Sequence, residues 1–136
     1  MKIIAFDLGD VHTGIAQADE LGLFATPRTS IATKDLINWV KETLQNEQLE
    51  TIVIGLPKTL KGTQSQQTEK VLAYKQKLEE LFPQINWILW DERLTSKEAR
   101  TMKSKQIKKE KNKEHAIAAA LILEGYLDFL RYKAKS

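Results

Sequence analysis

The stretch that decides the fold of this 136-residue chain is KIIAFDLGDVHTGIA, residues 2–16. It opens on a short apolar run, residues 3–6, which is typical of a strand buried on both faces. Asp7 follows directly, and Gly9 and Gly14 then enclose a polar turn. An acid at a strand end, beside glycines that allow close approach, is typical of a metal or phosphate site. It is as typical of a plain turn, so the rest of the chain has to decide.

Composition places the chain among ordinary globular proteins, with 42% hydrophobic and 29% charged residues. The length predicts a single domain over residues 1–136. The sequence holds no cysteine, which excludes disulfides and thiolate metal sites and fits a reducing compartment. We see no signal peptide, and no apolar run approaches the roughly 20 residues that cross a bilayer. We therefore expect a cytoplasmic protein without a membrane partner.

Positive charge gathers in residues 97–113, where seven lysines and Arg100 stand against two glutamates, a net charge of +6. The whole chain carries only +3, so the remainder is acidic. Such a segment is either a surface for a phosphate backbone or a solvated lysine loop. A second loop, residues 58–63, offers lysines, hydroxyls and a glycine just after a strand. The candidate nucleic-acid contacts in these two segments are Lys58, Lys61, Lys103, Lys105, Lys108 and Lys109.

Hydrophobic periodicity predicts five strands and four helices. The strands are expected at residues 3–6, 15–18, 23–26, 51–55 and 85–90, and the helices at 34–48, 65–81, 95–102 and 114–132. We expect Thr33 to cap the first helix and Pro27 to lead the chain away from the sheet. In the second helix, Leu81 is expected to point inward with Val71, Leu72 and Leu78. In the last helix the buried stripe is Ala116, Ala120, Leu123, Leu127 and Leu130.

This order predicts a mixed α/β sheet of three antiparallel strands followed by two parallel ones, flanked by helices. Right-handed crossovers place the carboxyl ends of the first, fourth and fifth strands on one edge. Asp7 and the pair Asp91 and Glu92 then converge there, and the last helix brings His115 and Glu114 to the same edge. Converging carboxylates need a cation to offset their repulsion, and Mg²⁺ or Mn²⁺ suits oxygen ligands.

Four segments, in order along nearly the whole chain, resemble the YqgF family of ribonuclease H-like proteins. These are the resolvase-type nucleases linked to processing of the precursor of 16S ribosomal RNA. The segments are FDLG with GIA (residues 6–9 and 14–16), VIGLP with Gly62 (residues 53–57), DERLT (residues 91–95), and AA with ILEGYL (residues 118–119 and 122–127).

The resemblance implies a ribonuclease H-like fold and hydrolysis of phosphodiester bonds by acids that hold divalent metal, Mg or Mn, as two ions with substrate. The implied catalytic residues are Asp7, Asp91, Glu92 and His115, of which Asp7, Glu92 and His115 would bind metal. Arg93 would position a carboxylate or a phosphate. The implied partner is nucleic acid, either the 5′ end of pre-16S rRNA or branched DNA such as a Holliday junction, within ribosomal precursor particles. We expect a monomer or weak homodimer.

The chain departs from the family pattern in its first hairpin and its last helix. Val11 and His12 stand where a Lys-Arg type pair is usual, and His115 stands where an aspartate is usual. His115 has three interpretations: a metal ligand that favours Mn²⁺, a proton shuttle, or the sign of an inactive site. Glu114 cannot simply replace the aspartate, because neighbouring helical residues point about 100° apart. His12 is a further candidate for the site.

Two functions from other classes compete with the nuclease. The first is a nucleic-acid or ribosome-assembly binding module whose catalysis is weakened by His115. The second is an ATPase of the actin or sugar-kinase type, whose first hairpin also reads Asp-x-Gly. An ATPase of that type needs a second domain to close over the nucleotide, and the chain has neither the length for one nor a G-x-x-x-x-G-K-[ST] loop.

Overall fold

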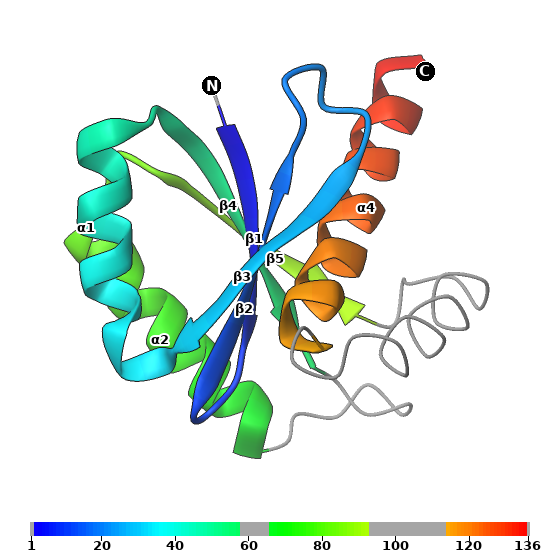
Figure 1. The fold of residues 1–136 in the computed structure, drawn as a ribbon. Helices are drawn as coiled ribbons and strands as arrows, with labels where there is room; N and C mark the ends of the chain where they lie inside the picture. Colours follow the sequence, from blue (N-terminus) through cyan, green and yellow to red (C-terminus); the bar gives the residue numbers. More distant parts are fainter. Residues whose placement is uncertain (1, 58–65, 93–113, 136) are drawn as a thin grey trace.

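The computed structural model describes residues 2–57, 66–92 and 114–135, which form one five-stranded sheet with helices on both faces (Figure 1). The expected helix at 95–102 and the loop at 58–63 lie outside these residues. The elements in chain order are β1 (Lys2–Leu8), β2 (His12–Ala18), β3 (Ala25–Ala32), the 3₁₀ turn η1 (Thr33–Asp35), α1 (Leu36–Asn46), β4 (Leu49–Leu56), α2 (Gln66–Leu81), β5 (Asn86–Asp91) and α4 (Glu114–Lys135).

The strand order in the sheet is β3-β2-β1-β4-β5. The first three strands are antiparallel, whereas β4 pairs in parallel with β1 and β5 pairs in parallel with β4. The predicted mixed sheet is therefore confirmed. Since β1, β4 and β5 run in one direction, their carboxyl ends share one edge of the sheet, which we call the carboxyl edge.

The core has two layers because neighbouring residues of a strand point to opposite faces. Ile4 and Phe6 of β1 pack with α1 and α2 on one face, while Ala5 packs with α4 on the other. Figure 1 shows this division, with α1 and α2 on one side of the sheet and α4 on the other. The predicted stripe of α4 is confirmed, since its members are buried or partly buried: Ala116, Ala120, Leu123, Leu127 and Leu130.

The expectation that the third strand ends at Pro27 is wrong. β3 begins at Ala25 and continues through Pro27 to Ala32, paired with β2 along that length. Proline lacks the N–H that a central strand needs, but β3 is an edge strand, where this loss is tolerated. The pairing also shifts register between Ile15 and Ala16, opposite the proline, as a β-bulge does.

Thr33 does not cap the first helix, because the chain makes the 3₁₀ turn η1 before α1 begins at Leu36. Its hydroxyl instead donates to the carbonyl of Gly9 at 2.7 Å, which ties η1 to the first hairpin. The inward placement of Leu81 is also wrong, since this side chain is 46% exposed at the last position of α2. Val71 and Leu78 are buried as expected, and Leu72 is partly buried.

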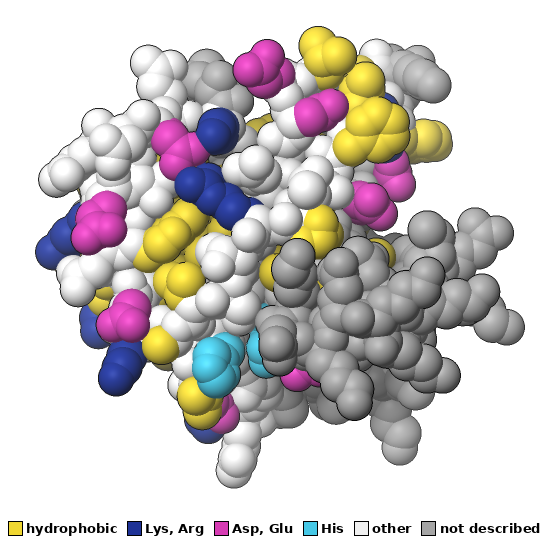
Figure 2. Space-filling view, viewed as in Figure 1, with side chains coloured by type: hydrophobic (Ala, Val, Ile, Leu, Met, Phe, Trp, Pro, Cys, Tyr) yellow, Lys and Arg dark blue, Asp and Glu magenta, His cyan; other side chains and the backbone are white. Residues whose placement is uncertain are grey.

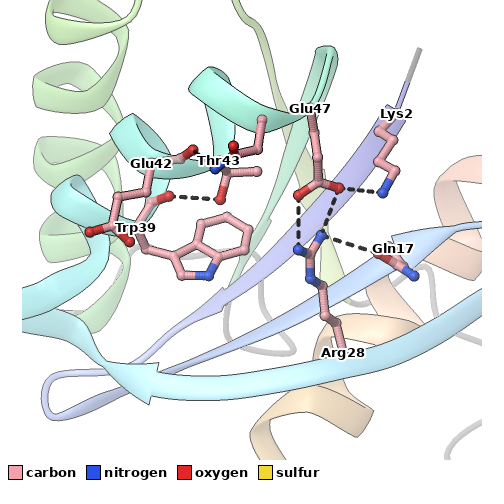
Figure 3. A network of polar contacts seen from close by, with 8 residues as sticks. Lys2, Gln17, Arg28, Trp39, Glu42, Thr43 and Glu47 are labelled. Carbon is pink, nitrogen blue, oxygen red and sulfur yellow. Dashed lines mark hydrogen bonds and ion pairs between the residues drawn. The ribbon is translucent and has the colours of Figure 1, made fainter.

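A charged cluster ties β1, β3 and α1 together at the end of β1 away from Asp7 (Figure 3). The carboxylate of Glu47 accepts hydrogen bonds from Lys2 and from Arg28, the latter at 2.9 Å. The Arg28 guanidinium also lies 5.3 Å from the ring centre of Trp39. The hydrogen bonds from Arg28 and then Lys2 lower the pKa of Glu47 to about 2.

Among the described residues, no helix combines the length and the apolar character that spanning a membrane requires.

Candidate functional site

Asp7 lies at the carboxyl end of β1, on the face of the sheet that α4 covers. Its neighbour Ala5, two residues earlier, belongs to the α4 layer, whereas Phe6 belongs to the opposite layer. The Asp7 side chain is 23% exposed, and its Oδ2 lies 3.4 Å from Nδ1 of His115, the second residue of α4. The structure thus brings together two candidate residues that are 108 positions apart in the sequence.

A glycine on β2 lets the first turn of α4 come close to the sheet beside Asp7. Gly14 is the partner of Asp7 across the β1–β2 ladder. A Cβ placed on Gly14 would lie 1.9 Å from the backbone oxygen of His115, far inside any real contact. The sequence suggested that this glycine leaves room for a phosphate or a metal. The structure shows that the first turn of α4 occupies that room, which fixes the backbone of His115 opposite Asp7.

The two histidines of the chain lie next to each other at this site. The ring of His12, at the start of β2, is stacked on the ring of His115 with 6.1 Å between centroids and 26° between planes. Figure 2 shows them as two cyan groups below the centre of the view. His12 is exposed and His115 is partly buried, so the pair lies at the solvent boundary beside Asp7. Val11, the other hairpin departure from the family pattern, is 67% exposed.

Glu92 follows β5 directly and reaches over the neighbouring strand β4. Two residues earlier, Trp90 packs in the α4 layer, and alternation places Glu92 on that same face. A Cβ placed on Gly55 would lie 2.7 Å from Oε1 of Glu92, so the carboxylate lies directly above this glycine.

In the parallel β1–β4 ladder, Phe6 is the partner of Ile54. The next residues along the two strands are Asp7 and Gly55, so Gly55 is the lateral neighbour of Asp7. Neighbouring strands are about 4.8 Å apart. The acids of β1 and of the segment after β5 therefore approach each other on the α4 side of the carboxyl edge.

Two further candidates belong to the described residues, Asp91 and Glu114, and neither lies with this group. Asp91 pairs with Leu56 at the end of β5, and alternation directs it to the face of Leu89, away from α4. Glu114 is exposed at the first position of α4. The remaining candidates lie outside the described residues: Arg93, Lys58, Lys61, Lys103, Lys105, Lys108 and Lys109.

The donor set fits a divalent cation that keeps part of its shell for water or substrate. Adjacent ligands of such an ion are about 3 Å apart, which is close to the 3.4 Å between Asp7 and His115. In the described ranges, no three histidine, aspartate or glutamate side chains stand close enough to hold an ion by themselves. Mg²⁺ is commonly held by one or two carboxylates with water and phosphate oxygens completing the shell. A site with few protein ligands is therefore chemically sufficient.

A sheet of order 3-2-1-4-5 with an acid at the end of its central strand, facing the last helix, defines the class of the chain: a ribonuclease H-like α/β protein. Comparison with known proteins gives the family. The family of RuvX, described as Holliday junction resolvase, matches residues 1–129, and the chain belongs to it. The resemblance expected from the four sequence segments is confirmed, and it places the chain among nucleases, which hydrolyse phosphodiester bonds.

Similar proteins over nearly the full length come from several bacteria, each named "putative pre-16S rRNA nuclease". One from Thermoanaerobacter pseudethanolicus is 36% identical, covering 98% of this chain and all of the relative. One from Staphylococcus carnosus is 36% identical, covering 96% of this chain and 97% of the relative. One from Clostridium botulinum is 38% identical, covering 96% and 98%.

Proposed function

We propose that this protein is a metal-dependent nuclease that cleaves phosphodiester bonds in the precursor of 16S ribosomal RNA, near its 5′ end. The observation that carries the proposal is the 3.4 Å approach of His115 to Asp7 at the carboxyl edge, with the Glu92 carboxylate above Gly55, the lateral neighbour of Asp7. Family membership supports the reaction, and the names of the relatives support the substrate. With that substrate the protein would act in the cytoplasm.

Asp7, Glu92 and His115 are the residues that would hold Mg²⁺ or Mn²⁺, as two ions with substrate. When bound, the metal supplies an activated water and stabilises the leaving oxygen. Asp7 is partly buried between the sheet and α4, so its carboxylate has few alternative positions. His115 is held by its backbone contact with Gly14 and presents Nδ1 to Asp7. An imidazole in the ligand set favours Mn²⁺ over Mg²⁺.

The test is cleavage of a pre-16S rRNA fragment in the presence of Mn²⁺, with the wild type and Asp7→Asn. We expect the variant to lose cleavage by about 10²-fold or more while it still binds the RNA, because the amide is a poor ligand for a hard cation. Asp35→Asn is the matched control, since this acid is exposed in η1. Chelation with EDTA should stop cleavage by the wild type. Equal cleavage by wild type and Asp7→Asn would refute the role of Asp7.

A second candidate function, a binding module for nucleic acid or the assembling ribosome, is favoured by one observation. The described residues bring only pairs of candidate ligands together, and the imidazole of His115 already faces Asp7. Steeply salt-dependent RNA binding without cleavage in Mg²⁺ or Mn²⁺ would support the module over the nuclease.

Further proposals concern substrate and assembly. The same chemistry would serve a branched DNA, so a Holliday junction of matched length is the competitor to include in the cleavage assay. We propose that residues 1–136 act as one domain, within ribosomal precursor particles, as a monomer or weak homodimer. Light scattering across a concentration series tests the state of assembly.

A further inference from the structure

A pocket of about 400 Å³ lies between the first hairpin and α2, on the other face of the sheet from Asp7. Its lining includes Leu8, Gly9 and Asp10 of the hairpin and Lys70, Tyr74 and Lys77 of α2. Leu8 is the residue after Asp7 in β1, and it belongs to the opposite layer of the core. The pocket therefore begins one residue beyond the candidate catalytic acid. Figure 1 shows the β1–β2 turn and the first turns of α2 at the same end of the molecule.

Hydrogen bonds hold α2 to the elements beside it, so the pocket is formed without a ligand. The hydroxyl of Tyr74 donates to the carbonyl of Thr33 at 3.2 Å, and the amide of Gln67 donates to the carbonyl of Leu8 at 3.4 Å. Burial raises the pKa of Tyr74, so this phenol is neutral at pH 7. Leu8, Val71 and Tyr74 give the pocket an apolar and partly aromatic wall.

The rim of the pocket is cationic. Lys70 and Lys77 are seven residues apart on α2, and two helical turns place both on one side, about 10 Å apart along the axis. Lys70 lies 3.3 Å from Asp10, and both side chains are about 60% exposed, at 61% and 59%. Exposed ion pairs contribute little stability, so a phosphate can replace Asp10 as the partner of Lys70. Lys70, Lys77 and Asp10 together carry a net charge of +1.

We propose that this pocket binds one nucleotide of the strand whose phosphodiester lies at Asp7, with the base on the apolar wall and the flanking phosphates at Lys70 and Lys77. The proposal rests on the proposed nuclease function. Apolar and aromatic walls stack bases whatever their sequence, and lysines at the rim bind the backbone. The volume is within the range of small-molecule sites, about 300–1,000 Å³. The hairpin tip would then lie between the cleaved bond and the bound nucleotide.

The first test measures binding alone, in metal-free buffer, with a fluorescent single-stranded RNA of about 12 nucleotides. The variant is Lys70→Ala with Lys77→Ala, and the matched control is Lys34→Ala with Lys41→Ala, which removes two exposed lysines near α1. We expect the pocket variant to lose about tenfold in affinity, and its slope of log K against log salt to fall by about 1.4, as two lost phosphate contacts require. The control should bind like the wild type.

The second test fills the pocket without changing its charge. Ala73 is exposed and lines the pocket, so Ala73→Trp places an indole where the base would bind. In the wild type, 2-aminopurine moved along the RNA should be quenched at one position, and Ala73→Trp should abolish this quenching. A DNA strand of the same sequence shows whether the pocket requires the 2′-hydroxyl. Circular dichroism confirms that each variant is folded, and the lysine variant tests the pocket if Ala73→Trp does not fold.

The outcomes separate this inference from the proposed function. If Asp7→Asn abolishes cleavage but the lysine variant binds with the wild-type affinity and salt slope, the pocket inference fails and the nuclease stands. Unchanged quenching in folded Ala73→Trp also overturns the pocket inference. If the wild type neither binds nor cleaves nucleic acid, both proposals fail together.

Discussion

The imidazole of His115 faces the Asp7 carboxylate at 3.4 Å, at the position where the resemblance to the YqgF family led us to expect an aspartate. Two acids at this distance repel each other unless a cation lies between them. An imidazole and a carboxylate do not repel each other in this way. A histidine in place of an aspartate therefore changes both the charge of the ligand set and the kind of ion that it prefers.

We predict that His115→Asp shifts the metal preference of cleavage toward Mg²⁺. An aspartate replaces a nitrogen ligand by an oxygen ligand, which suits the harder ion, and the ratio of Mg²⁺-supported to Mn²⁺-supported rates should rise about tenfold. The measurement is the cleavage rate at matched concentrations of each ion. His12→Asp serves as a comparison, since it places the same carboxylate on β2, beside His115 rather than in its place. An unchanged ratio would exclude His115 from the ligand set.

At the other end of β1, Glu47 makes stability depend on pH. Its pKa is about 2 in the folded chain, against 4.5 as the reference value. A lowered folded pKa gives stability that is fully present above pH 4.5 and is lost as the pH falls through 2. The side chains of Lys2 and Arg28 are 43% and 29% exposed, so screening reduces the effect to about 1 kcal/mol.

We therefore expect Glu47→Gln to lower the free energy of unfolding by about 1 kcal/mol at pH 7, with the difference shrinking toward pH 2. Urea denaturation at a series of pH values measures it. Glu42→Gln is the control, because Glu42 is an exposed acid of α1. A difference that stays constant down to pH 2 would contradict the electrostatic origin.

Two glycines of the sheet, Gly14 and Gly55, leave room for groups that lie directly over them. At Gly14 an added Cβ would meet the backbone of His115, whereas at Gly55 it would meet the ends of the Ile122 and Glu92 side chains. The backbone of His115 cannot move unless α4 moves with it, whereas the ends of the Ile122 and Glu92 side chains can rotate. The two glycines should therefore differ in what they control.

We predict that Gly14→Ala destabilises the fold by about 3 kcal/mol, since the clash must displace the first turn of α4. Thermal or urea unfolding measures the loss. Gly22→Asn is the control: Gly22 has a φ of 69° and open space around its Cβ position, and asparagine tolerates that conformation. Unfolding of Gly14→Ala at the wild-type midpoint would show that α4 does not pack on β2 as described.

Gly55→Ala should instead affect cleavage more than stability. We expect a stability loss of about 1 kcal/mol, because Ile122 can repack, but a loss of cleavage of about 10²-fold, because the Glu92 carboxylate must leave its place. Comparing the unfolding free energy with the cleavage rate of the same preparation separates the two effects. Wild-type cleavage by this variant would remove Glu92 from the site.

The elements show how far the sequence could be interpreted. Apolar periodicity predicted the five strands, the helices α1, α2 and α4 and the burial stripe of α4, because these depend on local pattern, but it did not predict the 3₁₀ turn η1. The predicted third strand ended before Pro27, because proline is not tolerated in a central strand. Only the sheet order shows that β3 is an edge strand. The proximity of Asp7 and His115 could be predicted from the order of the strands and helices along the chain. The role of Gly14 could not, since it depends on which helix crosses which strand, a property of tertiary packing.

Across the whole molecule, charge is divided unequally. Residues 97–113 carry +6, so the rest of the chain carries −3. Nucleic acid bound at an acidic carboxyl edge needs compensation from elsewhere, and this segment is the largest source of positive charge in the sequence.

We expect the combined change of Lys103, Lys105, Lys108 and Lys109 to alanine to weaken RNA binding about equally for all sequences. The slope of log K against log salt should fall by about 2.8, as the loss of four phosphate contacts requires. Anisotropy titrations between about 50 and about 200 mM salt measure it, with the Lys34 and Lys41 variant as control. An unchanged slope would identify the segment as a solvated loop.

The bulge and the proline in β3 also bear on how copies of this chain behave in a crowded solution. An open sheet edge offers a row of backbone groups to which a strand of another molecule can add, the first step toward aggregation. Pro27 removes one donor from that row, and the register shift opposite it interrupts the regular spacing. Replacing Pro27 by threonine would return one donor to the edge strand, and the cost would appear as lower solubility rather than a weaker fold.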